Sequence, residues 1–153
     1  MLALAVALAL VIGDQWSKDW VRRSLSLYEM RPIVDGFAYL TYVRNTGAAW
    51  GMFRGANLWL ALLSLLTLVL LLRFRASLVR PSPAHRIALG LLAGGIVGNL
   101  MDRLRLGYVT DFLSLHFGRY EFPAFNLADS GITLAVVVFA VSSWWLDRHE
   151  RAH

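Results

Sequence analysis

The residues best suited to chemistry are the carboxylates Asp111 and Asp129, which lie in and just after a polar segment that separates two apolar runs. In a place of low dielectric, two carboxylates a few ångströms apart cannot both ionise, so the pair holds one proton near neutral pH. One carboxylate can then take a proton from water while the other donates a proton to a carbonyl oxygen. The pair therefore fits amide hydrolysis without a covalent intermediate, a chemistry open to a chain that has no Cys.

Other polar residues that could support such a pair also lie at the ends of apolar runs. Asp14 follows the first run, Asn45 precedes the second, and Asn99 lies near the end of the third. Because neighbouring runs are expected to be antiparallel, all of these residues should lie at one face of the membrane. Ionisable residues at membrane depth are by default a functional hypothesis. The complete set comprises Asp14, Asn45, Asn99, Asp102, Arg103, Asp111, Asn126 and Asp129.

Structural roles compete with catalytic ones at some of these positions. The pattern Asn126-x-x-Asp129 before an apolar run also fits a helix start, with Asn126 as the N-cap and Asp129 favoured by the helix dipole. That role does not exclude catalysis. For Asp102 and Arg103 we favour a structural role, in which the Arg103 side chain reaches the membrane interface or pairs with a carboxylate.

Three other patterns favour structure over chemistry. Gly94, Gly95 and Gly98 fit close helix packing better than a phosphate loop, because apolar residues surround them. Ser17 and Lys18 are adjacent, and adjacent helix residues point apart, so we discount a serine and lysine hydrolase pair. The His residues show no metal-ligand spacing, so we expect neither a metal nor a cofactor.

The composition predicts a membrane protein. Of 153 residues, 58% are apolar and only 16% are charged, and the mean hydropathy is +0.54. A typical soluble domain is about half apolar and about a quarter charged. The net charge is +5, but most Lys and Arg residues flank apolar runs. An anionic lipid surface is therefore the expected partner, and nucleic acid is not.

Uncharged stretches predict four transmembrane helices in a single membrane domain over residues 1–153. A span needs about 20 residues, and the second and fourth stretches nearly reach this length. The first and third reach it only through their polar ends, which places ionisable residues at membrane depth. The first stretch could instead be a cleaved signal peptide, but it lacks a basic n-region and a small-residue cleavage site. The predicted spans are about 1–20, 55–73, 86–105 and 127–146.

The connection at residues 73–86 sets the expected orientation, because it holds four Arg and no acidic residue. Short basic loops stay in the cytoplasm, so both termini should be cytoplasmic and the polar residues should lie near the outer face. On that face, residues 37–43, 108–112 and 120–125 are rich in aromatic and β-branched residues and predict short strands. We therefore expect an all-α integral membrane protein that carries a small extracytoplasmic β-sheet.

Five short strings carry a resemblance to a known family. In their order among the apolar runs, they resemble the motifs of the bacterial lipoprotein signal peptidases, also called signal peptidase II. The resemblance covers essentially the whole chain. The strings are DQWSK at 14–18, VRNTGAAWG at 43–51, GGIVGNLMDR at 94–103, VTDF at 109–112 and FNLAD at 125–129.

The resemblance implies an aspartic endopeptidase of the bacterial inner membrane. Such an enzyme removes signal peptides from diacylglyceryl-modified prolipoproteins by cutting before the lipidated Cys, and globomycin, a cyclic peptide, inhibits it. The family's catalytic pair falls on Asp111 and Asp129, the same pair that chemistry alone selects. The family fold implies four transmembrane helices, a small outer sheet and a short outer helix. The supporting residues implied by similarity are Asp14, Lys18, Asn45, Asn99, Arg103 and Asn126.

The expected partners are a prolipoprotein substrate and membrane lipids, and the protein is expected to act as a monomer. The competing hypothesis is a small membrane protein that is not an enzyme, such as a proton-relay subunit of a transporter or a lipid-binding scaffold. A proton relay would place charged residues at several depths, whereas here they gather at one side.

Overall fold

The computed structural model describes the chain except for residues 48–51, 54, 79, 81 and 151–153. The described residues form four long helices and four strands, and the strands lie between the helices in the chain. The elements are, in order, α1 (Leu2–Ser24), β1 (Met30–Val34), β2 (Ala38–Asn45), α2 (Asn57–Leu78), α3 (Pro83–Leu106), β3 (Val109–Phe117), β4 (Tyr120–Phe125) and α4 (Leu127–Glu150).

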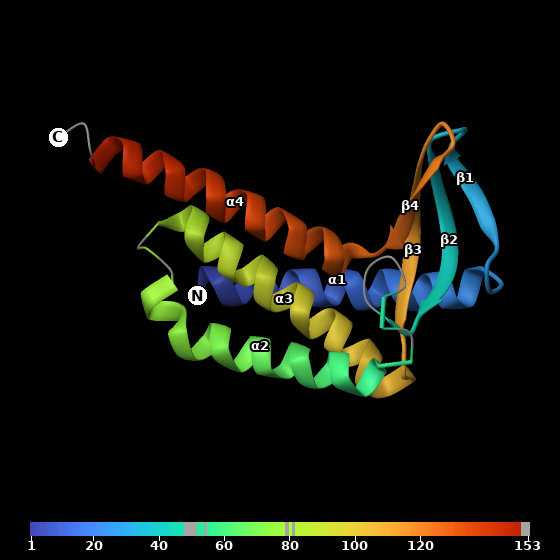
Figure 1. Ribbon diagram of the computed structural model, residues 1–153, viewed down its shortest axis with the longest axis horizontal. Coiled ribbons are helices and arrows are strands. Elements are labelled where there is room, and N and C mark those ends of the chain that lie inside the picture. The colour runs from blue at the N-terminus through green and yellow to red at the C-terminus, as the bar shows by residue number, and fades with distance from the viewer. Residues whose placement is uncertain (48–51, 54, 79, 81, 151–153) are drawn as a thin grey trace.

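The helix α3 is the centre of the helical layer. It contacts α1, α2 and α4, and the sheet stands across one end of the helices (Figure 1). Glycines of α3 permit this close packing. A Cβ atom at Gly90 would lie 2.5 Å from the carbonyl oxygen of Ala3, and one at Gly95 would lie 2.5 Å from that of Ala128. The prediction of close helix packing through small residues is thereby confirmed.

The prediction of four transmembrane helices is wrong. Within the described residues, three helical segments are long and apolar enough to cross a membrane: Asn57–Ser77, Pro83–Leu106 and Leu127–Arg148. They correspond to the last three predicted spans. The helix α1 is long enough, but it is apolar only up to Gly13, and its second half carries Asp14, Lys18, Asp19, Arg22 and Arg23.

The expectation of an all-α protein is also wrong, because the sheet is a substantial part of the fold. It has the order β1-β2-β3-β4, with every neighbouring pair antiparallel. The predicted strands at 37–43, 108–112 and 120–125 correspond to β2, β3 and β4. The strand β1 was not predicted, because it contains Pro32 and is exposed along its length, as an edge strand can be. Outside the four long helices, the described residues contain no short outer helix.

A small apolar cluster attaches the sheet to the helices. Val21 and Leu25 from the end of α1 pack against Tyr42 of β2 and Phe112 of β3, and all four side chains are buried. Burial of such side chains contributes roughly 1.5–3 kcal/mol each. The cluster fixes β3 relative to α1, and it thereby fixes the position of Asp111, the neighbour of Phe112.

Candidate active site

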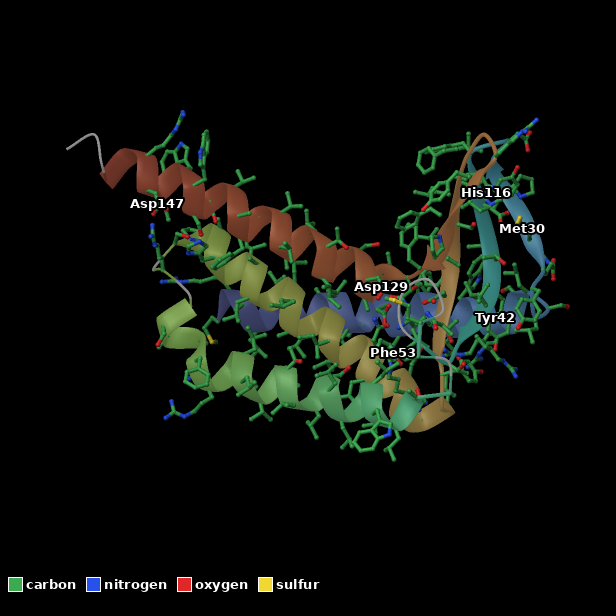
Figure 2. All side chains as sticks on the ribbon, viewed as in Figure 1. Met30, Tyr42, Phe53, His116, Asp129 and Asp147 are labelled. Atoms are coloured by element: carbon green, nitrogen blue, oxygen red, sulfur yellow. The ribbon has the colours of Figure 1, made fainter. Side chains whose placement is uncertain are left out.

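The two carboxylates come from different elements that meet where the helices end. Asp111 lies in β3 and is only 2% exposed, although it is an ionisable residue. Asp129 lies in the first turn of α4, where that helix meets the sheet (Figure 2). The tertiary structure therefore brings together the two residues that the sequence selected.

Asn126 links the two carboxylates at the start of α4. Its Oδ1 atom accepts a 3.0 Å hydrogen bond from the backbone N–H of Asp129. The backbone N–H of Asn126 in turn donates to Asp129 Oδ2 at 3.3 Å. Its Nδ2 atom donates a 2.7 Å hydrogen bond to Asp111 Oδ1. Asn126 is thus the helix N-cap, as the structural interpretation predicted, and it also contacts Asp111.

Two further asparagines complete the contacts of the carboxylate oxygens. Asn45 donates through Nδ2 to Asp111 Oδ2 at 2.9 Å, and Asn99 donates through Nδ2 to Asp129 Oδ1 at 2.7 Å. Each of the four carboxylate oxygens therefore accepts one N–H bond from an uncharged group. A carboxylate oxygen has two lone pairs, so each oxygen keeps capacity for water or substrate.

Lys18 fixes the orientation of the Asn99 amide. The Lys18 ammonium is fully buried and donates to Asn99 Oδ1 at 2.9 Å. The same oxygen accepts from Asn126 Nδ2 at 3.2 Å. With its oxygen held by two donors, the Asn99 amide must present its NH₂ group to Asp129. Lys18 therefore acts on Asp129 through Asn99.

Lys18 also belongs to a buried ion cluster that ties four elements together. Its Nζ atom lies 2.8 Å from Asp14 Oδ2 and 3.5 Å from Asp102 Oδ2. Asp14 accepts from the backbone N–H of Ala128 in α4 at 2.9 Å, and Asp102 accepts from that of Thr110 in β3 at 2.9 Å. Both backbone groups belong to the residue just before a member of the carboxylate pair.

Asp102, for which the sequence predicted a structural role, belongs to this cluster together with Gln15, which sequence reasoning did not place at the site. Gln15 Nε2 donates to Asp14 Oδ2, Asp102 Oδ1 and the carbonyl oxygen of Gly98 at 3.1–3.2 Å. Asp102 keeps the structural role that the sequence favoured. Its position three residues after Asn99 was the available signal, because residues so spaced share a helix face.

Arg103 places a positive charge near the carboxylates. It is half-buried, and its charge acts on both Asp111 and Asp129. Its Nη2 atom donates to the carbonyl oxygen of Gly47 at 3.2 Å, next to the turn that Asn45 forms by accepting from Gly47 N–H. The last four residues of the VRNTGAAWG string, 48–51, lie outside the described part of the chain.

The local electrostatics favour a proton on Asp111. Burial, helped by the negative charge of Asp129, raises the pKa of the Asp111 carboxyl to about 7. The hydrogen bonds from Asn45 and Asn126 and the charge of Lys18 act in the opposite direction and are weaker. A carboxyl group with this pKa can donate a proton at neutral pH.

Three other possible sites carry no comparable chemistry. Ser17 donates from Oγ to the carbonyl oxygen of Asp14, while Lys18 points into the ion cluster, so the two do not form a hydrolase pair. Within the described ranges, no three His, Asp or Glu side chains are grouped to hold a metal ion. A cavity of about 290 Å³ between α2, α3 and α4 is lined almost entirely by apolar side chains and contains neither carboxylate.

Comparisons with known proteins agree on one family. The family model described as signal peptidase (SPase) II matches residues 6–145. The chain is similar to a lipoprotein signal peptidase of Geobacillus kaustophilus (strain HTA426), with 39% identity over 97% of this chain and 96% of the relative. It is also similar to one of Desulforapulum autotrophicum, with 40% identity over 88% and 86% of the two chains.

The fold is similar to that of a solved bacterial membrane enzyme. That structure matches with a TM-score of 0.86 and 29% identity, and the match covers 93% of this chain and 87% of the solved one. A second solved structure, also described as a bacterial membrane enzyme, matches with a TM-score of 0.82 over 92% and 90% of the two chains.

Proposed function

Because the chain belongs to the signal peptidase II family, whose members are lipoprotein signal peptidases, we propose that it cleaves prolipoproteins with the carboxylate pair Asp111 and Asp129. The family assignment makes it a membrane peptidase and sets aside the hypothesis of a protein that is not an enzyme. The observation that supports the aspartic mechanism is that all four oxygens of the two carboxylates accept hydrogen bonds from uncharged donors.

In the proposed reaction, the two carboxylates have different roles at the start. Asp111 is protonated and donates its proton to the scissile carbonyl oxygen, while ionised Asp129 takes a proton from water. The water oxygen bonds to the carbonyl carbon and forms a tetrahedral diol. Asp129 then gives its proton to the leaving nitrogen, the C–N bond breaks, and a diol hydroxyl returns its proton to Asp111. Both carboxylates regain their starting states.

The charges around the pair suit this proton count. The ion cluster has two carboxylates, Asp14 and Asp102, and two cations, Lys18 and Arg22, so its formal charge is balanced. Arg103 balances one charge of the carboxylate pair. A single proton shared by Asp111 and Asp129 neutralises the rest, and burial in low dielectric favours the neutral state.

The proposed substrate follows from the depth at which the carboxylates lie in the membrane. Asp129 lies at the beginning of one candidate span and Arg103 near the end of another, so the carboxylates lie where helices leave the hydrocarbon. An unmodified peptide backbone at this depth would lose hydration without compensation. A diacylglyceryl group contributes about 0.8 kcal/mol per buried methylene. It would hold the modified Cys at the interface and set the preceding peptide bond beside the pair.

We propose that the protein lies in the bacterial inner membrane with the carboxylates near the outer face. The start of α1, the end of α2, the start of α3 and the end of α4 all lie away from the sheet (Figure 1). The end of α2 and the start of α3 carry Arg73, Arg75 and Arg86, three of the arginines that favour a cytoplasmic location. Both chain ends are then cytoplasmic, and the sheet is extracytoplasmic.

The test is cleavage of a lipidated prolipoprotein by the purified protein in lipid bilayers. Asp111→Asn and Asp129→Asn should each reduce the rate by at least about 100-fold while leaving folding intact, because Asn keeps the volume but cannot exchange the proton. Asp35→Asn, at an exposed turn, is the matched control and should keep the wild-type rate. Full activity in either active-site variant would refute the proposed pair.

A second arm tests the substrate. A precursor with its lipid-bearing Cys changed to Ser should not be cut, and globomycin should block cleavage of the lipidated form. Efficient cleavage of the unlipidated precursor would show that the lipid does not position the scissile bond.

A further inference from the structure

A second polar cluster lies on the sheet and takes no part in the proposed reaction. The exposed Arg44 donates from Nε to the hydroxyl of Tyr42 at 2.9 Å, and that hydroxyl lies 3.1 Å from the hydroxyl of Tyr108. The Arg44 guanidinium carbon lies 5.0 Å from the centre of the Tyr108 ring and 5.6 Å from that of Tyr42. Two aromatic rings therefore hold the guanidinium in place.

The cluster faces away from the carboxylates. Successive side chains of a strand point to opposite faces, so Arg44 and its neighbour Asn45 lie on opposite sides of β2. Arg44 pairs with Thr110 across the sheet, next to Asp111 in β3. Directly opposite residues share a face, so Arg44 lies beside Thr110. Thr110 Oγ1 accepts a 3.0 Å hydrogen bond from Arg22 Nη1, which brings a second guanidinium to this face.

Arg44 is unlike the arginines that have acidic partners. Arg22, Arg23 and Arg31 each lie within 4.0 Å of a carboxylate oxygen. The contacts that hold the guanidinium of Arg44 are made with the uncharged tyrosines Tyr42 and Tyr108. A guanidinium has five N–H groups, and one of them is used by Tyr42, so a planar array of donors is available.

The position of Arg44 and Tyr108 relative to the membrane indicates what they bind. The candidate span Pro83–Leu106 ends two residues before Tyr108, on which Arg44 stacks. Beyond the end of a span lies the polar headgroup layer of the bilayer. We propose that Arg44, together with Tyr108, binds the phosphodiester of an anionic phospholipid headgroup.

The chemistry of the groups fits this ligand. Arg binds phosphate oxygens through two parallel N–H bonds, and the Tyr108 hydroxyl can add a third donor. The tyrosine rings hold the guanidinium before binding, so little side-chain entropy is lost on contact. A lipid bound here would hold β2 and β3 at the membrane surface. These strands carry Asn45 and Asp111, so the lipid would keep the catalytic edge of the sheet at the height of the scissile bond.

The experiment measures lipid selectivity of the intact protein. The protein is placed in phosphatidylcholine discs that contain a small fraction of spin-labelled phosphatidylglycerol, and electron paramagnetic resonance gives the association constant of this lipid relative to phosphatidylcholine. Arg44→Gln should lower it about fivefold, the effect expected of one arginine near an anionic surface. Arg119→Gln, an exposed arginine at the β3–β4 turn, removes the same charge and should leave it unchanged.

Further variants separate the site from general charge and from loss of structure. Tyr108→Phe keeps the ring but removes a hydroxyl, and should lower the association constant about threefold. Arg44→Lys should lower it as well, because a lysine lacks the planar fork. Thermal unfolding checks that each variant is folded. If Arg44→Gln does not fold, Tyr108→Phe decides.

An equal fall in the association constant in Arg44→Gln and Arg119→Gln would overturn the proposal, because the lipid selectivity would then come from net charge. An association constant that is unchanged in every variant of the cluster would also overturn the proposal. Inorganic phosphate at matched ionic strength should displace the lipid no more than chloride does. Specific displacement by phosphate would show that the ligand is a soluble phosphate rather than a lipid.

Discussion

The side chain of Asn126 donates a 2.7 Å hydrogen bond to Asp111 and accepts one from the backbone of the residue that pairs with it, Asp129. One amide thus performs two separable tasks. Its oxygen caps α4, which contributes to stability, and its nitrogen orients Asp111, which belongs to the proposed chemistry. A variant that keeps only one of these tasks tells them apart.

Asn126→Ser is that variant. Serine is about as good an N-cap as asparagine, so Asn126→Ser should keep the capping contribution of about 1 kcal/mol to the free energy of unfolding. Its short side chain has no NH₂ group to reach Asp111, so kcat should fall by about 10-fold or more. Asn126→Ala should lose both the cap of α4 and the contact with Asp111, and the loss of the cap should lower the free energy of unfolding by about 1 kcal/mol. Thermal unfolding and cleavage kinetics give the two readouts, and a fully active Ser variant would contradict the orienting role.

The pH dependence of cleavage should report the proton on Asp111. The pKa of this carboxyl is raised to about 7, so activity should be present below pH 7 and decline as the pH rises through about 7. The hydrogen bond from Asn45 favours the ionised form. Asn45→Ala should therefore raise the pKa of Asp111 and move the decline to higher pH. A decline that stays in place, or moves to lower pH, would argue against Asp111 as the acid.

Removing the buried ammonium should be severe. Lys18→Met leaves Asp14 and Asp102 buried without this cation, and breaking a buried ion pair on one side costs about 3–5 kcal/mol. In the double variant Lys18→Met with Asp14→Asn, stability should partly return, because a carboxylate is removed and the new Oδ1 can still accept from Ala128 N–H. Unfolding by denaturant in detergent measures both.

The same double variant separates stability from positioning. It still lacks the donor that holds Asn99 Oδ1, so kcat should stay low although stability has recovered. Recovery of kcat together with stability would mean that Lys18 acts only through folding.

The orientation in the membrane can be tested with single cysteines, because the chain has none of its own. A cysteine at Ser82, near the start of α3, should react only with reagents that enter the cytoplasm. One at Arg119, in the β3–β4 turn, should react with impermeant reagents from outside. The reverse pattern would place the carboxylates at the cytoplasmic face.

The sequence by itself indicated a membrane protein, the last three spans, three of the four strands and the carboxylate pair. These inferences depend on local properties. An apolar run of sufficient length, an alternating aromatic strand and a carboxylate at the end of a span are each visible in a few consecutive residues. The five strings added the family, because their order does not depend on knowing how the elements pack.

The tertiary structure decided what depends on residues far apart in the chain. Asp14 and Lys18 are buried in α1 because partners on α3 and α4, far away in the chain, compensate their charges. The strand β1 exists because β2 offers it an edge, despite its proline. The register of β2 on β3 places Arg44 beside Thr110 and puts Asn45 on the same face of the sheet as Asp111. Long-range hydrogen bonds and strand pairing set these outcomes, and neither leaves a mark in a local pattern of residues.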